Sequence, residues 1–308
     1  MKNSIFVLWL IVAALLTFVA ARLIDNAYFY FAGYVVLQYI ALATAWNILG
    51  GYTGYVNFGI PAFIALGAYS TVVLHKLTSL PLIVMMLVGG IVSGLVGVGT
   101  GYLTLRLRGT FFSIATLAMA VVMQTLVTNW AFVGGSRGAY IIRPATVQYL
   151  GIDYIQYLFL MMLGLCVLTV GVARAIEKSR LGYGFATIRD DELAAEASGV
   201  PTLRLKLIAT GLSGGFMGMA GAPLPYYVTY LDPASAFSLS YAVNTIAMPL
   251  IGGTSSWLGP ILGAILLGTL QQVATVTISS ALSLLIVGVM LVVFVVAAPK
   301  GIIGWFWK

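Results

Sequence analysis

The chain has 308 residues, of which 61% are hydrophobic and only 7% are charged. Ordinary soluble domains are roughly 45–50% apolar and about 25% charged, so this composition excludes a small soluble enzyme, a nucleic-acid-binding protein and a disordered chain. The net charge of +7 comes from 15 basic residues spread thinly between apolar runs, which is typical of topology signals in a polytopic membrane protein.

Ten apolar runs are long enough, at about 20 residues each, to form transmembrane helices. In chain order they cover residues 4–21, 30–49, 57–74, 81–105, 110–130, 154–173, 205–222, 240–258, 260–278 and 281–298. Two joints contain helix-breaking residues, a glycine turn at residues 50–54 and the pair Gly259-Pro260. The third run contains Pro61, so a full span and a re-entrant segment both stay open. We expect an all-α polytopic membrane protein of about ten transmembrane helices.

The positions of Lys and Arg predict the orientation. With ten spans and a cytoplasmic amino terminus, eleven basic residues fall on the cytoplasmic side and four on the outer side, which together make the 15 in the sequence. Both termini are therefore expected in the cytoplasm. Helices 2–5 then run opposite to helices 7–10, which allows an inverted repeat about an axis in the membrane plane. The cytoplasmic set is Lys2, Arg106, Arg108, Arg174, Lys178, Arg180, Arg189, Arg204, Lys206, Lys300 and Lys308, and the outer set is Arg22, Lys76, Arg137 and Arg143.

Glycines four residues apart place small residues on one face of several predicted helices. Gly90 with Gly94, and Gly211 with Gly215, are two such pairs. In lipid this spacing allows helix backbones to approach closely. We interpret the pairs as packing sites within the chain, in preference to a dimerisation motif.

The eight acidic residues all fall outside the predicted spans. Proton-coupled carriers place carboxylates in the bilayer because a titrating group must lie on the path, so this distribution argues against proton coupling. A sodium site built from carbonyls and hydroxyls stays open. One His, one Cys and no phosphate-binding glycine loop offer no catalytic triad, metal cluster or ATP site of that kind. We expect no cofactor and no enzymatic activity in this chain.

Four uncharged polar residues inside the spans are candidates for a solute pathway. Most such side chains form hydrogen bonds between helices, and that alternative stays open here. Asn47, Asn57 and Asn244 lie near glycine- or proline-interrupted segments, where irregular backbone is tolerated mainly if it lines a cavity or is covered by protein. Together with Thr116 they are predicted to line a translocation pathway.

Residues 174–206 differ in composition from the rest of the chain, because they hold 6 of the 15 basic residues and 5 of the 8 acids. Asp191 and Glu192 suit the start of a helix, and Gly199 followed by Pro201 suits its end. We expect a two-turn helix over residues 191–198 whose alanine face is small enough to enter a groove on a partner. The alternative is a solvated linker.

Four stretches carry a resemblance to a known family. They are WNILGGYTGYVNFG at 46–59, LRLRGTFFSIATL at 105–117, SRLGYGFATIRDDELAAEASGV at 179–200 and LIGGTSSWLGP at 250–260. In this order they resemble the permease subunits of branched-chain amino-acid ABC importers, the Liv type, and more specifically its LivM-like branch. The resemblance extends over roughly residues 37–300 and implies that residues 1–308 form a single transmembrane permease domain, with residues 174–206 as its cytoplasmic coupling loop.

The family implies a function and a set of partners. The expected function is that of a permease subunit in the bacterial inner membrane, which translocates amino acids, branched-chain ones first, with ATP hydrolysed by other subunits. The expected partners are two cytoplasmic ABC ATPase subunits, a second and different permease subunit, an extracytoplasmic solute-binding protein and the lipid bilayer, with no nucleic acid. An ATPase-independent secondary carrier or channel for a small polar solute is the alternative.

The resemblance also implies a coupling helix that docks on an ATPase. One departure from the family is Tyr183, which stands where a basic residue is frequent. The implied coupling residues are Arg189, Asp190, Asp191, Glu192, Ala194, Ala195 and Glu196.

Overall fold

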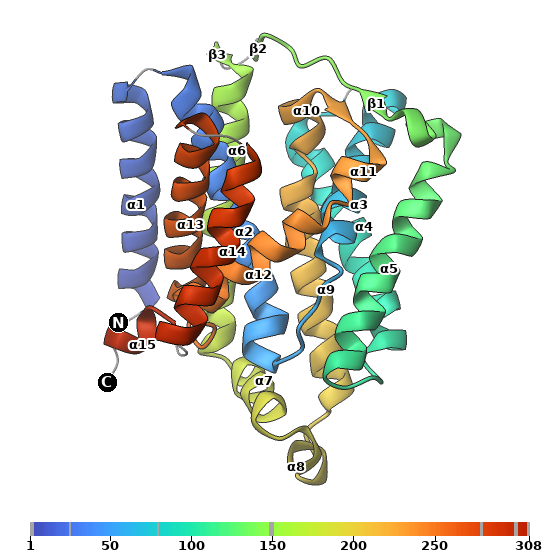
Figure 1. Ribbon diagram of the computed structural model, residues 1–308, viewed down its shortest axis with the longest axis vertical. Helices are drawn as coiled ribbons and strands as arrows, with labels where there is room; N and C mark the ends of the chain where they lie inside the picture. The colour runs from blue at the N-terminus through green and yellow to red at the C-terminus, as the bar shows by residue number, and fades with distance from the viewer. Residues whose placement is uncertain are drawn as a thin grey trace.

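The computed structural model describes residues 3–24, 26–78, 80–147, 151–277, 280–298 and 301–306, and it shows a bundle of long helices with short elements at both ends (Figure 1). Lys2, Lys300 and Lys308, counted above as cytoplasmic, lie outside the described residues, as does residue 278, the expected end of the ninth run.

Each apolar run has a helix in the described part of the chain. Eight stretches of the chain are helical, long and apolar enough to cross a membrane, whereas α1 and α14 contribute shorter apolar stretches, Leu8–Ile24 and Leu285–Phe294. The structure therefore shows a helical membrane protein with eight candidate spans among the described residues. The long helices are α1 (Asn3–Ile24), α2 (Ala27–Thr53), α3 (Ile60–Leu77), α4 (Leu82–Thr104), α5 (Thr110–Thr128), α6 (Tyr154–Glu177), α9 (Thr202–Gly221), α12 (Leu239–Gly252), α13 (Leu258–Thr277) and α14 (Ser280–Ala297).

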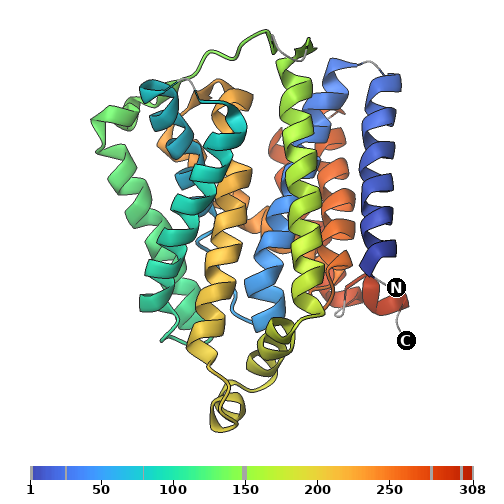
Figure 2. The ribbon, with the colours of Figure 1, turned by 180° about the vertical axis from the view of Figure 1, so that it is seen from behind.

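The short elements gather at the two ends of the bundle. α7, α8 and α15 lie at one end with the first turn of α1, and the strands lie at the other (Figures 1 and 2). Two antiparallel ladders pair β1 with β4 and β2 with β3. These elements are η1 (Ala131–Val133), η2 (Gly135–Arg137), β1 (Ala139–Tyr140), β2 (Thr146–Val147), β3 (Ile152–Asp153), α7 (Arg180–Asp190), α8 (Glu192–Ala197), α10 (Leu224–Val228), β4 (Tyr230–Leu231), α11 (Pro233–Ala236) and α15 (Ile303–Phe306).

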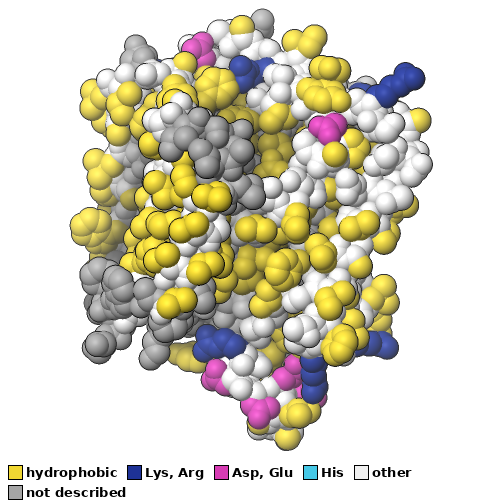
Figure 3. Space-filling model, in the orientation of Figure 1, with side chains coloured by type: hydrophobic (Ala, Val, Ile, Leu, Met, Phe, Trp, Pro, Cys, Tyr) yellow, Lys and Arg dark blue, Asp and Glu magenta, His cyan; other side chains and the backbone are white. Residues whose placement is uncertain are grey.

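Charged and hydrophobic side chains are segregated on the surface of the molecule. Figure 3 shows charged side chains toward the two ends of the molecule and hydrophobic side chains over the middle of the visible face. The α8 end carries both signs of charge close together. Because hydrocarbon solvates apolar groups and excludes charges, this distribution fits a helical bundle that spans a membrane.

α2 and α9 form the centre of the bundle. They pack on each other, α9 also packs on α3 and α4, and α2 also packs on α6, α12 and α13. Close approach depends on glycine: a Cβ at Gly67 of α3 would collide with the backbone of Gly218 of α9. A Cβ at Gly94 of α4 would lie 3.1 Å from the carbonyl oxygen of Gly211 of α9. The predicted glycine pairs therefore do pack within the chain.

The first expected joint lies later than predicted. α2 continues through Gly50 and Gly51 to Thr53. The side chains of Trp46 and Asn47 lie over these two glycines and would collide with a Cβ there, so the glycines serve packing and do not end the helix. Gly54, with φ of 77°, ends α2, and residues 54–59 are not helical. The prediction of a glycine turn at residues 50–54 was therefore wrong by several residues.

Pro61 does not break the third helix. It lies in the first turn of α3, where an N–H group has no partner within the helix, so the helix runs uninterrupted from Ile60 to Leu77. The second joint was also misplaced: α12 ends at Gly252, and Gly259-Pro260 falls inside the start of α13. Gly253 has φ of 117°, a conformation that side chains disfavour, and it is the residue that ends α12.

Candidate functional site

Residues 54–59 form a non-helical segment between α2 and α3, which we call the break segment; Tyr55, Asn57 and Gly59 in it are buried. Its backbone is held by side chains. The indole Nε1 of Trp46 donates to the carbonyl oxygen of Asn57 at 3.0 Å, and Asn57 Oδ1 accepts a hydrogen bond from the N–H of Gly59 at 2.7 Å. Irregular backbone in a membrane needs such partners, so Asn57 shapes the entry into α3.

α5 supplies two further anchors for the break segment. Ser113 Oγ donates to the carbonyl oxygen of Val56 at 2.8 Å, and Thr116 Oγ1 accepts from the N–H of Phe58 at 3.1 Å. Thr116, a predicted pathway residue, therefore holds the segment against α5. The structure thus brings Asn57 and Thr116 together at the break.

Asn47 of α2 and Asn244 of α12, the other predicted pathway residues, are 1% and 3% exposed. Asn244 Nδ2 donates to Tyr39 Oη at 3.0 Å, whereas its Oδ1 has no hydrogen-bond partner. The side-chain Nδ2 and Oδ1 of Asn47 also have no hydrogen-bond partner. In the described part of the chain, buried side-chain oxygens without a partner occur in addition on Tyr34, Thr44, Tyr69, Thr71, Ser213 and Thr245.

These polar groups belong to α2, α3, α9 and α12, and α2 and α3 each contact both α9 and α12. Buried polar groups in proteins nearly always have a hydrogen-bond partner, so a concentration of exceptions at one set of helix contacts needs a reason. Hydroxyl and amide groups are what a polar solute would bind in an otherwise apolar bundle. The centre of the bundle is therefore chemically suited to pass such a solute.

The segment between α6 and α9 contains the predicted short helix. Asp191 caps α8 by accepting hydrogen bonds from the N–H groups of Leu193 at 2.9 Å and Ala194 at 3.1 Å. Gly199, with φ of 82°, follows its end. The predicted helix over residues 191–198 is confirmed as Glu192–Ala197, because its start and end signals are local.

The seven predicted coupling residues do not share one environment. Arg189, Asp190 and Ala194 are exposed, and Arg189 Nε lies 3.4 Å from Asp190 Oδ1. Asp191 is the cap of α8, and Ala195 is only 5% exposed. Glu192 and Glu196 form ion pairs within the chain.

Two exposed apolar side chains at this end were missed as site residues from the sequence. Tyr183 of α7 is 70% exposed and Leu193 of α8 is 63% exposed. Both lie within the stretch 179–200 that carries the family resemblance, and that was the available signal. Together with Arg189, Asp190 and Ala194 they form what we call the α7–α8 surface.

Glu192 connects α8 to the break segment through a buried lysine. Lys206 Nζ of α9 lies 2.8 Å from Glu192 Oε1, 3.1 Å from Tyr55 Oη and 3.1 Å from the carbonyl oxygen of Leu105. Tyr55 Oη donates in turn to Glu192 Oε2. We call Tyr55, Glu192 and Lys206 the junction, because they join α8, α9, the end of α4 and the break segment.

The junction is charged and largely removed from solvent. The side chains of Lys206 and Glu192 are 4% and 12% exposed, and Arg108 Nη2 lies 3.6 Å from Glu192 Oε1. Burial by itself would raise the pKa of the Glu192 carboxyl, but hydrogen bonds from Lys206 and Tyr55 and the charges of Lys206 and Arg108 together hold that pKa below its usual value. Glu192 is therefore ionised at neutral pH.

A cavity of about 550 Å³ adjoins the junction. Val56 and Phe58 of the break segment line it, the start of α5 contributes Ser113, and Arg189 and Glu192 line it from the α7–α8 side. The cavity thus has charged and hydroxyl groups in its wall, and Thr53, the last residue of α2, also lines it.

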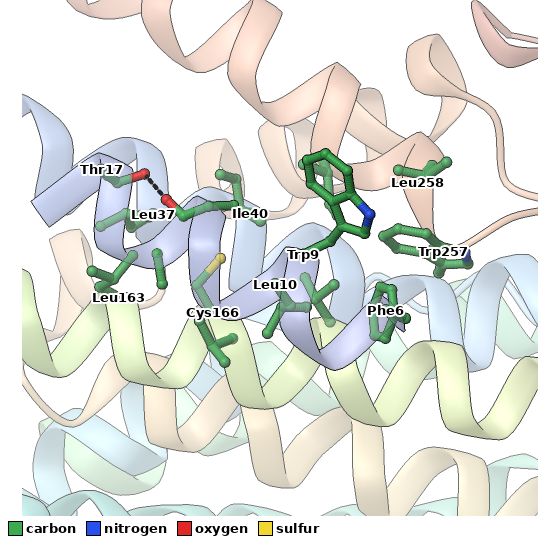
Figure 4. A pocket seen from close by; sticks show the side chains of 15 residues that line it. Phe6, Trp9, Leu10, Thr17, Leu37, Ile40, Leu163, Cys166, Trp257 and Leu258 are labelled. Atoms are coloured by element: carbon green, nitrogen blue, oxygen red, sulfur yellow. Dashed lines mark hydrogen bonds between the residues drawn. The ribbon is translucent and has the colours of Figure 1, made fainter. Parts of the chain in front are cut away.

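A different space, of about 460 Å³, lies between α1, α2, α6 and α13 and is lined almost wholly by apolar side chains (Figure 4). Trp9, Cys166 and Trp257 line it. The hydroxyl of Thr17, also in its wall, already donates to the carbonyl oxygen of Ala13 at 2.8 Å. This groove suits hydrocarbon, and it lacks the polar groups that a charged solute requires.

Sequence reasoning did not find the junction. Lys206 and Arg108 were counted only as topology signals, and Tyr55 had no assigned role. Lys206 and Tyr55 are 151 positions apart in the chain, so no local pattern reveals their contact. Tyr55 and Arg108 do fall within two of the stretches that carry the family resemblance, and that was the available signal.

A bundle of helices long and apolar enough to cross a membrane, with a non-helical segment between α2 and α3 and a capped two-helix loop at one end, is a multi-pass membrane protein. The chain belongs to the family described as "Branched-chain amino acid transport system / permease component", which it matches over residues 28–295. The expected family and the expected multi-pass location in the inner membrane are thereby confirmed.

Relatives with curated names agree with this family. The chain is 26% identical over 293 residues to "High-affinity branched-chain amino acid transport system permease protein LivM" of Salmonella typhimurium and of Escherichia coli, with 87% of this chain and 68% of each relative covered. It is 25% identical over 231 residues to "L-arabinose ABC transporter permease protein AraH" of Azospirillum brasilense, with 71% and 64% covered. No solved structure matches the chain significantly.

Proposed function

We propose that this protein is the membrane-spanning permease subunit of an ABC importer that carries amino acids, and branched-chain amino acids in particular. The observation that carries this proposal is the family match over residues 28–295. Two of its relatives bear the name of a branched-chain amino acid permease, which supports the substrate class. In this scheme ATP is hydrolysed by other subunits, and the chain itself catalyses no chemical step.

The importer would contain further subunits. We infer two cytoplasmic ATPase subunits, a second and different permease subunit, and an extracytoplasmic solute-binding protein. The α7–α8 surface supports an ATPase as partner, because it combines exposed apolar side chains with paired charges at one end of the bundle. Tyr183 and Leu193 would supply the apolar contact, and Arg189 and Asp190 the orientation.

We propose that residues 1–308 form one permease domain of ten spans, with the α8 end and both termini in the cytoplasm. Residues 174–206 would then contain the coupling loop. The distribution of basic residues supports this orientation: Arg108, Lys178 and Arg204 belong to the α8 end, whereas Arg137 and Arg143 belong to the connection between α5 and α6 at the other end.

The packing supports an inverted repeat of α2–α5 with α9 and α12–α14. α3 and α4 pack on each other and on α9, while α12 and α13 pack on each other and on α2. Each half also has an interruption after its first long helix: residues 54–59 in one, and in the other residues 222–238, which contain the short elements α10, β4 and α11. In such repeats the substrate site lies between the halves.

The solute pathway would run between α2, α3, α9 and α12. Asn47 and Asn244 offer unpartnered amide atoms to the solute. Asn57 and Thr116 keep the break segment at the side of the path through the hydrogen bonds described above.

Uptake by the reconstituted complex tests this function. The permease would be assembled in proteoliposomes with the ATPase subunits and binding protein of its own transporter, and radiolabelled leucine and arabinose would be offered. We expect leucine uptake that requires ATP. Leucine uptake by the permease chains alone would establish a secondary carrier instead. If the complex takes up arabinose in an ATP-dependent way but does not take up leucine, the proposed substrate class is refuted, whereas the proposed role as an ABC permease stands.

A further inference from the structure

We propose that the junction of Tyr55, Glu192 and Lys206 transmits movement of α8 to the break segment, and that the break segment is the cytoplasmic gate of the pathway. This role presupposes the ABC permease function proposed above and goes beyond it, because it names the residues through which an ATPase bound outside the membrane changes the pathway inside. Glu192 then acts within the permease as a positioning residue and is not part of the docking surface.

Both helices of the loop contact the break segment. Glu192 of α8 hydrogen-bonds with Tyr55, and Arg189 of α7 lies so close to Gly54 that a Cβ there would be 3.2 Å from Arg189 Cγ. A movement of α7 and α8 therefore reaches two consecutive residues of the segment. Lys206, on α9, fixes the resting position of this contact.

The relative strength of the contacts decides which of them yields. Glu192 is ionised, so the hydrogen bond that it accepts from Tyr55 is charge-assisted, and such bonds are about twice as strong as neutral ones. The bonds from Ser113 and Thr116 of α5 to the segment are neutral. When α8 is displaced, Tyr55 therefore follows Glu192, and the segment leaves α5.

The geometry makes this separation an opening. Val56 and Phe58 line the cavity of about 550 Å³ together with the start of α5, to which they are hydrogen-bonded. On the α2 side the segment is held by Trp46, whose indole donates to the carbonyl oxygen of Asn57, and Asn47 is the next residue of α2. Moving the segment away from α5 would join the cavity to the polar centre of the bundle.

Two conservative variants remove the link without removing bulk. Tyr55→Phe deletes the hydroxyl and keeps the ring, which packs edge-on against Phe112 at 5.1 Å between centroids. Glu192→Gln keeps the shape and deletes the charge. Tyr102→Phe is the matched control, because it removes a tyrosine hydroxyl from an exposed position on α4 near the same end.

The direct readout is a cysteine in the gate. Val56 is 37% exposed, and Cys166 is the single cysteine of the chain, so Val56→Cys in a Cys166→Ala background gives one reactive thiol there. The complex, with its ATPases and binding protein, would be labelled with a maleimide with and without ATP plus vanadate. ATP hydrolysis and uptake of radiolabelled leucine would be measured on the same preparations.

We expect nucleotide to change the labelling rate of Val56→Cys by about tenfold in the otherwise native junction, within the usual range for coupled sites. Tyr55→Phe and Glu192→Gln should abolish this change and lower leucine uptake about tenfold while ATP hydrolysis continues. Tyr102→Phe should give the same nucleotide-dependent labelling and the same leucine uptake as the protein with the native junction.

Three results would overturn the proposal. If labelling does not respond to nucleotide in a complex that imports leucine, the break segment is not the gate, although the permease function stands. If the response persists in both junction variants, the signal takes another route. If both variants lose the ATPase subunits on purification, the junction only stabilises the fold.

Discussion

At the scale of the residue, Thr245 and Thr44 separate a pathway role from a packing role. Both hydroxyls are buried without a hydrogen-bond partner. Valine has nearly the same shape, so Thr245→Val and Thr44→Val should leave thermal stability unchanged or raise it by about 1 kcal/mol, because each removes a buried unpaired polar atom. We expect leucine uptake to fall nonetheless, since the solute would lose a partner.

Gln38→Leu provides the contrast. Gln38 Nε2 donates to the carbonyl oxygen of Ala220 at 3.0 Å, so this variant removes a satisfied bond between α2 and α9 and should lower stability. Melting curves in detergent and uptake at matched permease content measure both effects. If leucine uptake is undiminished in Thr44→Val and Thr245→Val, these two hydroxyls do not line the solute pathway.

Glu192 gives a prediction about pH. Its pKa is lowered in the folded state by Lys206, Tyr55 and Arg108, so the ionised carboxylate stabilises the fold at neutral pH. That contribution is complete above the usual glutamate value of about 4.3 and is lost as the pH falls through the lower, folded-state pKa. At pH 7 Glu192→Gln should reduce stability by about 2 kcal/mol, as expected for hydrogen bonds to a charged group.

The gap between the melting temperatures of the native protein and Glu192→Gln should therefore narrow with acidification below about pH 4.3. Melting temperatures of both proteins across a pH series provide the measurement. If the gap between the two melting temperatures stays constant down to the lowest pH, the loss of the Glu192 charge is not the cause of the lower stability of Glu192→Gln.

At the scale of the element, α8 depends on its cap. A helix of six residues has little stability of its own, and Asp191 satisfies two of its free N–H groups. Asp191→Ala should cost about 1 kcal/mol locally and weaken co-purification of the ATPase subunits, while the permease is inserted at its normal level. Asp191→Asn keeps a cap of similar quality and should restore association. If Asp191→Asn and Asp191→Ala lose the same amount of ATPase association, the negative charge of Asp191 matters for docking and its role as a cap does not.

At the scale of the whole molecule, the two ends should face opposite sides of the membrane. Ser136 of η2 and Ser198 after α8 are exposed at opposite ends, so each accepts a cysteine in a Cys166→Ala background. Thr202 is unsuitable, because it is buried and donates to Glu196 Oε1 at 2.7 Å. An impermeant maleimide should label Ser136→Cys on intact cells and Ser198→Cys only in inside-out vesicles. Labelling of both on intact cells would contradict the ten-span orientation.

Local features were the ones predicted correctly from the sequence. Apolar length located every long helix, and the pattern of Asp191 and Gly199 located α8, because both signals act over a few residues. Gly50 and Gly51 were misread, since whether glycine ends a helix or admits a neighbouring side chain depends on packing. The junction was missed for the same reason: Tyr55 and Lys206 meet only when the whole bundle has formed.

The contact between Gly67 and Gly218 limits how the molecule is able to move. One turn away on either side of Gly67, α3 carries Phe63 and Thr71, so sliding α3 along α9 by a turn would press a side chain into backbone. We therefore expect α3 and α9 to move together as one rigid body, with little shear between them. We therefore expect any change of shape to be concentrated between the long helices, in residues 54–59 and in the short elements of residues 222–238.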